Sequence, residues 1–235
     1  MRPATLLSPG MSNAKTAKSE RAGKYSTIIL YLSPYKTSGK NLCAAASPGC
    51  ISTCLNTAGR GAMSPTQEAR LRRSLYFIED RAAFLDQVRD EIRRHVRRCK
   101  RKGILPAVRL NGTSDMPWES FGLMKEFPDV QFYDYTAIVN RAWAFAGNHP
   151  AWPKNYHLTF SRKENNEPEA FAMLSRGASV SVVFRKDIPA EWKGFRVING
   201  DETDLRFLDP RGVIVGLTAK GKAKKDRSGF VVDVA

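Results

Sequence analysis

The chain has 235 residues, an apolar fraction of 42% and a formal net charge of +15. It is long enough for one substantial hydrophobic core, and no stretch approaches the roughly 18 uninterrupted apolar residues of a membrane span. Its four cysteines are too few and too scattered for a small secreted disulfide scaffold. We therefore expect a globular protein of the cytoplasm whose charge attracts polyanions.

The first 24 residues are polar and basic without periodicity, so residues 1–24 are predicted to form a flexible basic arm in which Met11 is a second candidate start. Residues 25–235 are predicted to form a single α/β domain. Strands are expected at 25–32, 106–110, 130–133, 156–160, 178–184 and 195–198, and helices at 67–77, 81–101, 137–145 and 165–176.

This alternation of strands and helices predicts a partial (β/α) barrel or an open, mostly parallel sheet. An Asp-Pro-Arg-Gly turn at 209–212 predicts a C-terminal β-hairpin within residues 205–217. In both architectures, side chains at the carboxyl ends of the strands converge on one edge.

Three cysteines crowd into one short segment after the first predicted strand: Cys43, Cys50 and Cys54. A loop turning at Ser47-Pro48-Gly49 could bring three thiolates together as soft metal ligands. The set suits an iron–sulfur cluster or a zinc ion, although it lacks the paired CxxC knuckles of a standard zinc site. The alternative is a group of packed thiols.

Polar residues follow several other predicted strands. Asp115 and Asp134 are candidate catalytic acids, bases or metal ligands, with helix capping as the alternative role. The candidate substrate-binding residues are Arg109, Asn111, Ser114 and Arg162. Arg162 could bind a carboxylate or phosphate, or brace the structure by pairing with Asp134.

The longest predicted helix carries a dense run of cations. Arg93, Arg94, Arg97 and Arg98 recur at helical spacing, so they are predicted to lie on neighbouring turns. Such a face could bind the phosphates of a nucleic acid without reading its bases. The alternative is a solvated helix face.

Four motifs carry a resemblance to a known family, and they occupy residues 46–61, 108–115, 132–136 and 158–162. Together they resemble a phage and prophage family catalogued under the words "gene product eighty-eight", over about residues 25–232. The resemblance implies a gene of phage or mobile-element origin that acts in a bacterial cytoplasm.

A more distant similarity is to the radical S-adenosylmethionine enzymes. Cys50 and Cys54 match the first interval of their cysteine motif, but Thr57 stands where the third cysteine is expected, and Cys43 would have to replace it. This similarity implies a 4Fe–4S cluster that binds S-adenosylmethionine at its open iron. A zinc ion with three thiolates is the alternative cofactor.

Three hypotheses for the function follow. The first is a phage-encoded metal or iron–sulfur protein, with a three-cysteine site at the carboxyl edge of a barrel-like sheet. The second is a non-catalytic nucleic-acid-binding protein that uses the arginine-rich helix. The third is a metal-dependent nuclease built on Asp115, Asp134 and Asp201.

Overall fold

The computed structural model describes residues 2–21 and 23–234 and has an α/β fold. Its contacts divide the chain into two compact units. Unit 1 contains residues 1–44, 63–134 and 153–157, and unit 2 contains residues 45–62, 135–152 and 158–235. Two of the boundaries, at 134/135 and 157/158, fall inside strands β4 (Gln131–Thr136) and β5 (Tyr156–Ser161).

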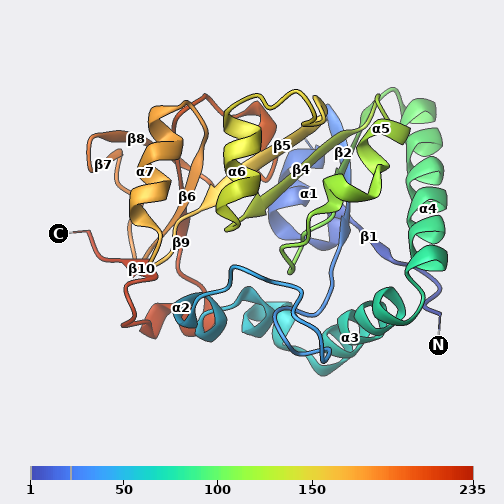
Figure 1. The fold of residues 1–235 in the computed structure, drawn as a ribbon, viewed down its shortest axis with the longest axis horizontal. Coiled ribbons are helices and arrows are strands. Elements are labelled where there is room, and N and C mark those ends of the chain that lie inside the picture. The colour runs from blue at the N-terminus through green and yellow to red at the C-terminus, as the bar shows by residue number, and fades with distance from the viewer. Residues whose placement is uncertain (1, 22, 235) are drawn as a thin grey trace. The chain divides into compact units, whose positions relative to one another are not determined.

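Unit 1 is built on strands in the order β1-β2-β3-β4 (Figure 1). The strand β1 (Leu7–Pro9) pairs antiparallel with β2 (Tyr25–Leu30), whereas β2 with β3 (Leu105–Arg109) and β3 with β4 are parallel. Its helices are α1 (Ala14–Arg21), α3 (Ser64–Glu79), α4 (Arg81–Lys102) and the short α5 (Leu123–Glu126).

The core of unit 1 includes the sheet residues Ile29, Val108 and Phe132, which are fully buried. Aromatic rings extend this core under α3 and α4, and the ring centroids of Phe77 and Phe84 lie 5.2 Å apart in an edge-to-face arrangement.

The sequence predicted a flexible basic arm over residues 1–24, whereas the described residues of this segment include regular secondary structure. They form β1 and α1, and the segment is attached to α4 by the buried carboxylate of Glu91. Oε2 of Glu91 accepts hydrogen bonds from the backbone N–H groups of Leu6 at 3.1 Å and Leu7 at 2.7 Å. A buried carboxylate that accepts backbone hydrogen bonds fixes a segment whose own composition is polar.

Unit 2 is built around β6 (Val180–Phe184). It pairs in parallel with β5, with β9 (Ile214–Thr218) and with the short β10 (Val231–Val232), and β8 (Phe195–Asn199) is parallel to β9 on the other side. The strand β7 (Glu191–Trp192) closes a hairpin with β8. Lys193 and Gly194 both have positive φ angles at its turn, of 51° and 81°, as a type I′ turn requires.

The helices of unit 2 are α2 (Pro48–Ser52), α6 (Val139–Ala146) and α7 (Glu167–Ser175). Met173 and Leu174 of α7 and Ala142 of α6 belong to the same core cluster as Phe160 and Val182 of the strands. The apolar faces of α6 and α7 therefore cover the sheet of this unit.

The six strands and four helices expected from the sequence all form, with ends shifted by a few residues. The C-terminal hairpin does not form. Arg206–Leu208 is a 3-10 helix, and β9 lies between two parallel partners, β6 and β8. Arg206 is fully buried beside Asp209, so the segment enters the interior instead of lying along β9.

None of the described helices combines the length and apolar character needed to cross a bilayer.

Candidate nucleic-acid interface

Helix α4 is the longest helix of unit 1, and both of its ends are set by local chemistry. Asp80 caps the N-terminus by accepting a hydrogen bond from the backbone N–H of Ala83 at 3.0 Å. Gly103 ends the helix in the left-handed conformation, with φ of 65°, and its N–H bonds back to the last turn. Local contacts therefore fix both ends of the helix.

One side of α4 is buried at helical spacing. Phe84, Val88, Ile92, His95 and Cys99 each have 2% exposure or less. These residues recur at intervals of three and four, which places them on one face against β2 and β3. The opposite face of α4 is consequently exposed to solvent.

The exposed face of the C-terminal half is cationic. Positions 93–102 hold seven lysines and arginines and no acid. Arg94, Arg97, Arg98 and Arg101 are all exposed. Arg97 and Arg98 each lie three or four residues from both Arg94 and Arg101, so the four residues form one stripe along the helix. We call these four residues the cationic face of α4.

The acids near α4 neutralise other arginines. Arg93 bonds Asp90 at 2.8 Å, and Arg89 bonds both Asp86 at 3.0 Å and Glu126 at 2.8 Å. Within the part of the chain that the structure describes, no ion pair involves any residue of the cationic face. These four exposed arginines therefore carry charge that no ion pair of the described residues offsets.

Further cations adjoin the C-terminal end of α4. The N–H of Leu105, three residues after the helix, donates to the carbonyl of Lys24 at 2.9 Å, which places Lys24 beside this end. Lys18 and Arg21, near the end of the adjacent helix α1, are exposed as well. The cationic surface thus extends beyond one helix.

The sequence predicted most of this surface but assigned its limits differently. Arg93 was expected to contact nucleic acid, yet it is paired with Asp90. Arg101 belongs to the same run of cations in the sequence but was not among the four residues predicted to bind nucleic acid, although its spacing of seven from Arg94 continues the same stripe. The helical periodicity was the signal that could have found it.

The three clustered cysteines belong to different units: Cys43 to unit 1, and Cys50 and Cys54 to unit 2. All are thiols and partly exposed. The sulfur of Cys43 accepts a hydrogen bond from the backbone N–H of Tyr35 at 3.3 Å. Among residues 2–21 and 23–234, no group of three or more His, Cys, Asp or Glu side chains is arranged to hold a metal ion.

In unit 2 the cysteine segment forms α2, and its start is held by a carboxylate. Glu164 accepts hydrogen bonds from Ser47 Oγ and from the N–H of Gly49, both at 2.8 Å. Ser47 caps the helix by accepting from the N–H of Cys50 at 3.3 Å. These contacts fix the backbone that carries Cys50.

Asp134 and Asn111 lie together in a buried polar network of unit 1. One carboxylate oxygen of the fully buried Asp134 accepts the Asn111 N–H at 2.7 Å, and the other accepts the Tyr156 hydroxyl at 2.9 Å. Asn111 Oδ1 in turn accepts from Ser114 Oγ at 3.0 Å and Trp118 Nε1 at 2.9 Å. The network brings three predicted site residues together, but in the interior, where it shapes the loop after β3.

The remaining predicted site residues are dispersed. Asp115 is half-buried in unit 1 and forms a parallel bridge with Cys43, whereas Arg109 lies at the end of β3. In unit 2, Asp201 accepts hydrogen bonds from the Thr218 N–H and from Lys220 Nζ, both at 2.9 Å.

Arg162 pairs with Glu167 at 2.9 Å, where Asp134 was the partner considered from the sequence. Burial alone would raise the pKa of Glu167, but hydrogen bonds from Lys193 and Arg162 outweigh it and lower that pKa. Arg162 also donates to the carbonyl of Phe230 at 3.2 Å. These bonds make Arg162 a brace between α7 and the segment before β10.

The fold and its surface define a basic α/β protein with an exposed cationic helix. The family model described as "Gene product 88" matches residues 5–234. The chain therefore belongs to the Gene product 88 family of phage proteins. No curated protein and no solved structure matches it.

Proposed function

We propose that this protein binds nucleic acid through the cationic face of α4. The observation that carries the proposal is the stripe of four exposed arginines, for which the described residues supply no ion pair. Each such arginine can displace a counterion from a phosphate backbone, and that release is the main source of non-specific affinity for nucleic acids.

The ordinary explanation of a basic helix end accounts for only part of this charge. Cations in the last turn interact favourably with the helix dipole, which explains Lys100, Arg101 and Lys102. Arg94, Arg97 and Arg98 lie before that turn, where the dipole stabilises little. The mutual repulsion of neighbouring arginines is a cost that a bound polyanion would remove.

The expected binding mode follows from the residue types. The cationic face offers guanidinium groups for phosphates, and base readout is not expected from it. Binding should therefore be strongly dependent on salt and only weakly dependent on sequence.

Fluorescence anisotropy with labelled single-stranded and duplex oligonucleotides tests this proposal. We expect submicromolar to micromolar binding at about 50 mM salt, weakening steeply as the salt concentration rises. An absence of binding to both oligonucleotides at about 20 mM salt, where electrostatic attraction is least screened, would remove the proposal.

A metal or iron–sulfur site at Cys43, Cys50 and Cys54 is the second candidate. The observation behind it is the sequence itself, which places three potential thiolate ligands within twelve residues. A 4Fe–4S cluster there would leave one iron open for S-adenosylmethionine, and a zinc ion would leave one position open for water.

Anaerobic purification followed by metal analysis and an absorbance spectrum tests this second candidate. A metal-free, colourless protein would contradict it. Divalent-metal dependence of strand cleavage, measured on the same preparation, tests the nuclease hypothesis for Asp115, Asp134 and Asp201.

A further inference from the structure

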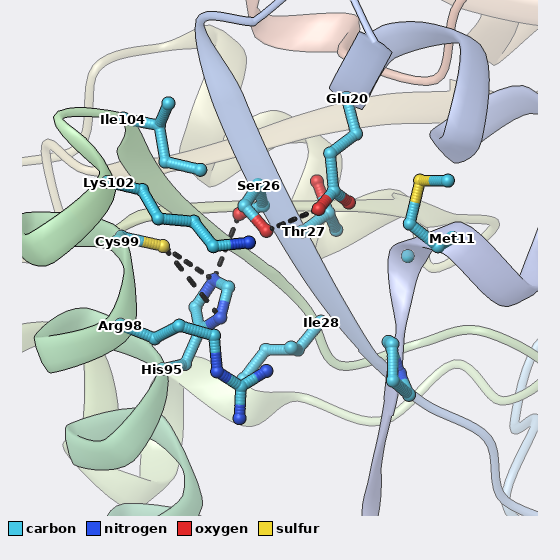
Figure 2. Close-up of a pocket in the computed structure, with 12 residues that line it drawn as sticks. Met11, Glu20, Ser26, Thr27, Ile28, His95, Arg98, Cys99, Lys102 and Ile104 are labelled. Carbon is cyan, nitrogen blue, oxygen red and sulfur yellow. Dashed lines mark hydrogen bonds between the residues drawn. The ribbon is translucent and has the colours of Figure 1, made fainter.

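A cavity of about 190 Å³ lies within unit 1 between α1, β2 and α4 (Figure 2). Sites that enclose a drug-sized ligand are usually larger, about 300 Å³ or more. This cavity therefore suits one planar ring system better than a whole nucleotide. The residues of α4 that line the cavity come from the C-terminal part of that helix.

The floor of the cavity is polar but uncharged. His95 is 2% exposed, and its Nε2 lies 2.9 Å from the carbonyl of Ser26, so this nitrogen carries the proton. Burial lowers the pKa of His95 and raises that of Cys99, whose sulfur lies 3.5 Å from the same nitrogen. Both groups are consequently neutral near pH 7.

The cavity is also lined by the carboxylate of Glu20, one oxygen of which accepts no hydrogen bond from the described residues. Glu20 Oε1 accepts a hydrogen bond from Ser26 Oγ at 2.9 Å, and Figure 2 shows this carboxylate directed toward β2. Glu20 Oε2 is shielded from solvent and has no hydrogen-bond partner within the described part of the chain. A buried carboxylate oxygen without a donor is costly, so a ligand that brings an N–H group would be favoured.

Cations and apolar groups complete the lining. Arg98 and Lys102, one turn apart on α4, extend toward β2 on either side of His95 (Figure 2). Arg98 is also part of the cationic face, so the cavity lining and the proposed phosphate-binding surface share this residue. Met11, which is 49% exposed, and Ile104 offer apolar contact for the faces of a ring.

We propose that this cavity receives an unpaired guanine base of a single strand whose phosphates lie on the cationic face of α4. This inference rests on the proposed function and adds a base preference to it. Proteins that read single strands hydrogen-bond the edges of unstacked bases and pack apolar side chains against them.

The choice of guanine follows from the donor and acceptor pattern of its edge. Its N1–H and 2-amino groups are adjacent donors that suit the Glu20 carboxylate, and its O6 acceptor suits the Lys102 ammonium. Thymine presents a carbonyl on each side of its single N–H, so one carbonyl would face the carboxylate. Adenine and cytosine present one amino group beside a ring nitrogen that accepts.

Fluorescence anisotropy at about 100 mM salt compares three labelled strands: oligo(dT), the same strand with one central dG, and the same strand with deoxyinosine at that position. We expect the dG strand to bind at least about fivefold more tightly than oligo(dT). Deoxyinosine lacks the 2-amino group, so its strand should lose most of this gain. This comparison uses the wild-type protein and needs no variant.

Two variants then assign the preference to the cavity. Glu20→Gln should reduce the preference for dG to less than about twofold while oligo(dT) still binds, because the amide offers one acceptor where the carboxylate offers two. Glu79→Gln is the matched control, since Glu79 is an exposed acid of α3 in the same unit and gives the same change in charge.

The outcomes separate the two proposals. If no strand binds even at about 20 mM salt, the proposed function fails, and this inference fails with it. If all three strands bind equally, the function stands and the guanine site is overturned. A dG preference that survives in Glu20→Gln would also overturn the assignment to this cavity.

Discussion

Replacing Arg97 and Arg98 by glutamine should halve the salt dependence of nucleic-acid binding. If the four arginines of the cationic face each neutralise one phosphate of a single strand, the slope of log K against log salt is about −2.8. Removing two contacts should reduce it to about −1.4. Because both side chains are exposed and glutamine is a good helix former, the free energy of unfolding should change by less than about 0.5 kcal/mol.

The difference is large enough to measure. Raising the salt from about 50 to about 200 mM should weaken binding by the wild-type protein about 50-fold, and binding by the variant only about 7-fold. Fluorescence anisotropy with a labelled single strand at four or five salt concentrations gives both slopes. Circular dichroism and urea unfolding confirm that the fold is retained.

The control is a second double variant that removes the same charge from arginines paired with acids. Arg72, 3.7 Å from Glu68, and Arg93, 2.8 Å from Asp90, are suitable because both are exposed and lie outside the cationic face. Their replacement by glutamine should change the slope by less than about 0.5. Equal slopes for both double variants would refute the reasoning, because net charge alone would then govern binding.

Three other residues and the cysteine pair give further predictions. Glu91→Ala should lower the free energy of unfolding, measured with urea, by about 2 to 3 kcal/mol, since it leaves buried N–H groups of the N-terminal segment without acceptors. A loss below about 0.5 kcal/mol would contradict the attachment of this segment to α4. Asp134→Ala should cost about 3 kcal/mol by the same assay, because it removes the acceptor of two buried hydrogen bonds, and an unchanged midpoint would show that the network is not structural. Burial raises the pKa of Asp209 to about 6, above its ordinary 3.8, so this residue stabilises the fold increasingly as the pH falls from about 6 to about 4. The free energy of unfolding of the wild type, relative to that of Asp209→Asn, should therefore rise as the pH falls through this range. Parallel plots of unfolding free energy against pH for the two proteins would exclude the shift. If Cys50 and Cys54 hold a metal, the protein should lose bound metal when both are replaced by alanine, as measured by elemental analysis, and equal metal content in the two proteins would exclude them as ligands.

The sequence determined the elements that depend on local pattern. The buried face of α4 repeats at three and four residues, and its ends carry a capping aspartate and a glycine, so its bounds were predictable to one residue. The parallel strands were equally predictable from the sequence, because short β-rich runs separated by helices leave few other strand topologies. The cationic stripe is visible in the sequence for the same reason, since helical spacing alone places Arg94, Arg97 and Arg98 on one side.

Tertiary structure decided what lies far apart in the chain. Nothing local shows that Glu91 holds Leu6 and Leu7, because 85 and 84 residues separate the partners. The burial of Asp134 and the entry of Arg206 into the core likewise depend on which elements pack around them. A single sequence shows which side chains are polar, but it does not show whether a distant acid neutralises an arginine. Arg93 is paired with Asp90, whereas no ion pair of the described residues involves the cationic face of α4. A charge is compensated by whichever groups the fold brings within a few ångströms.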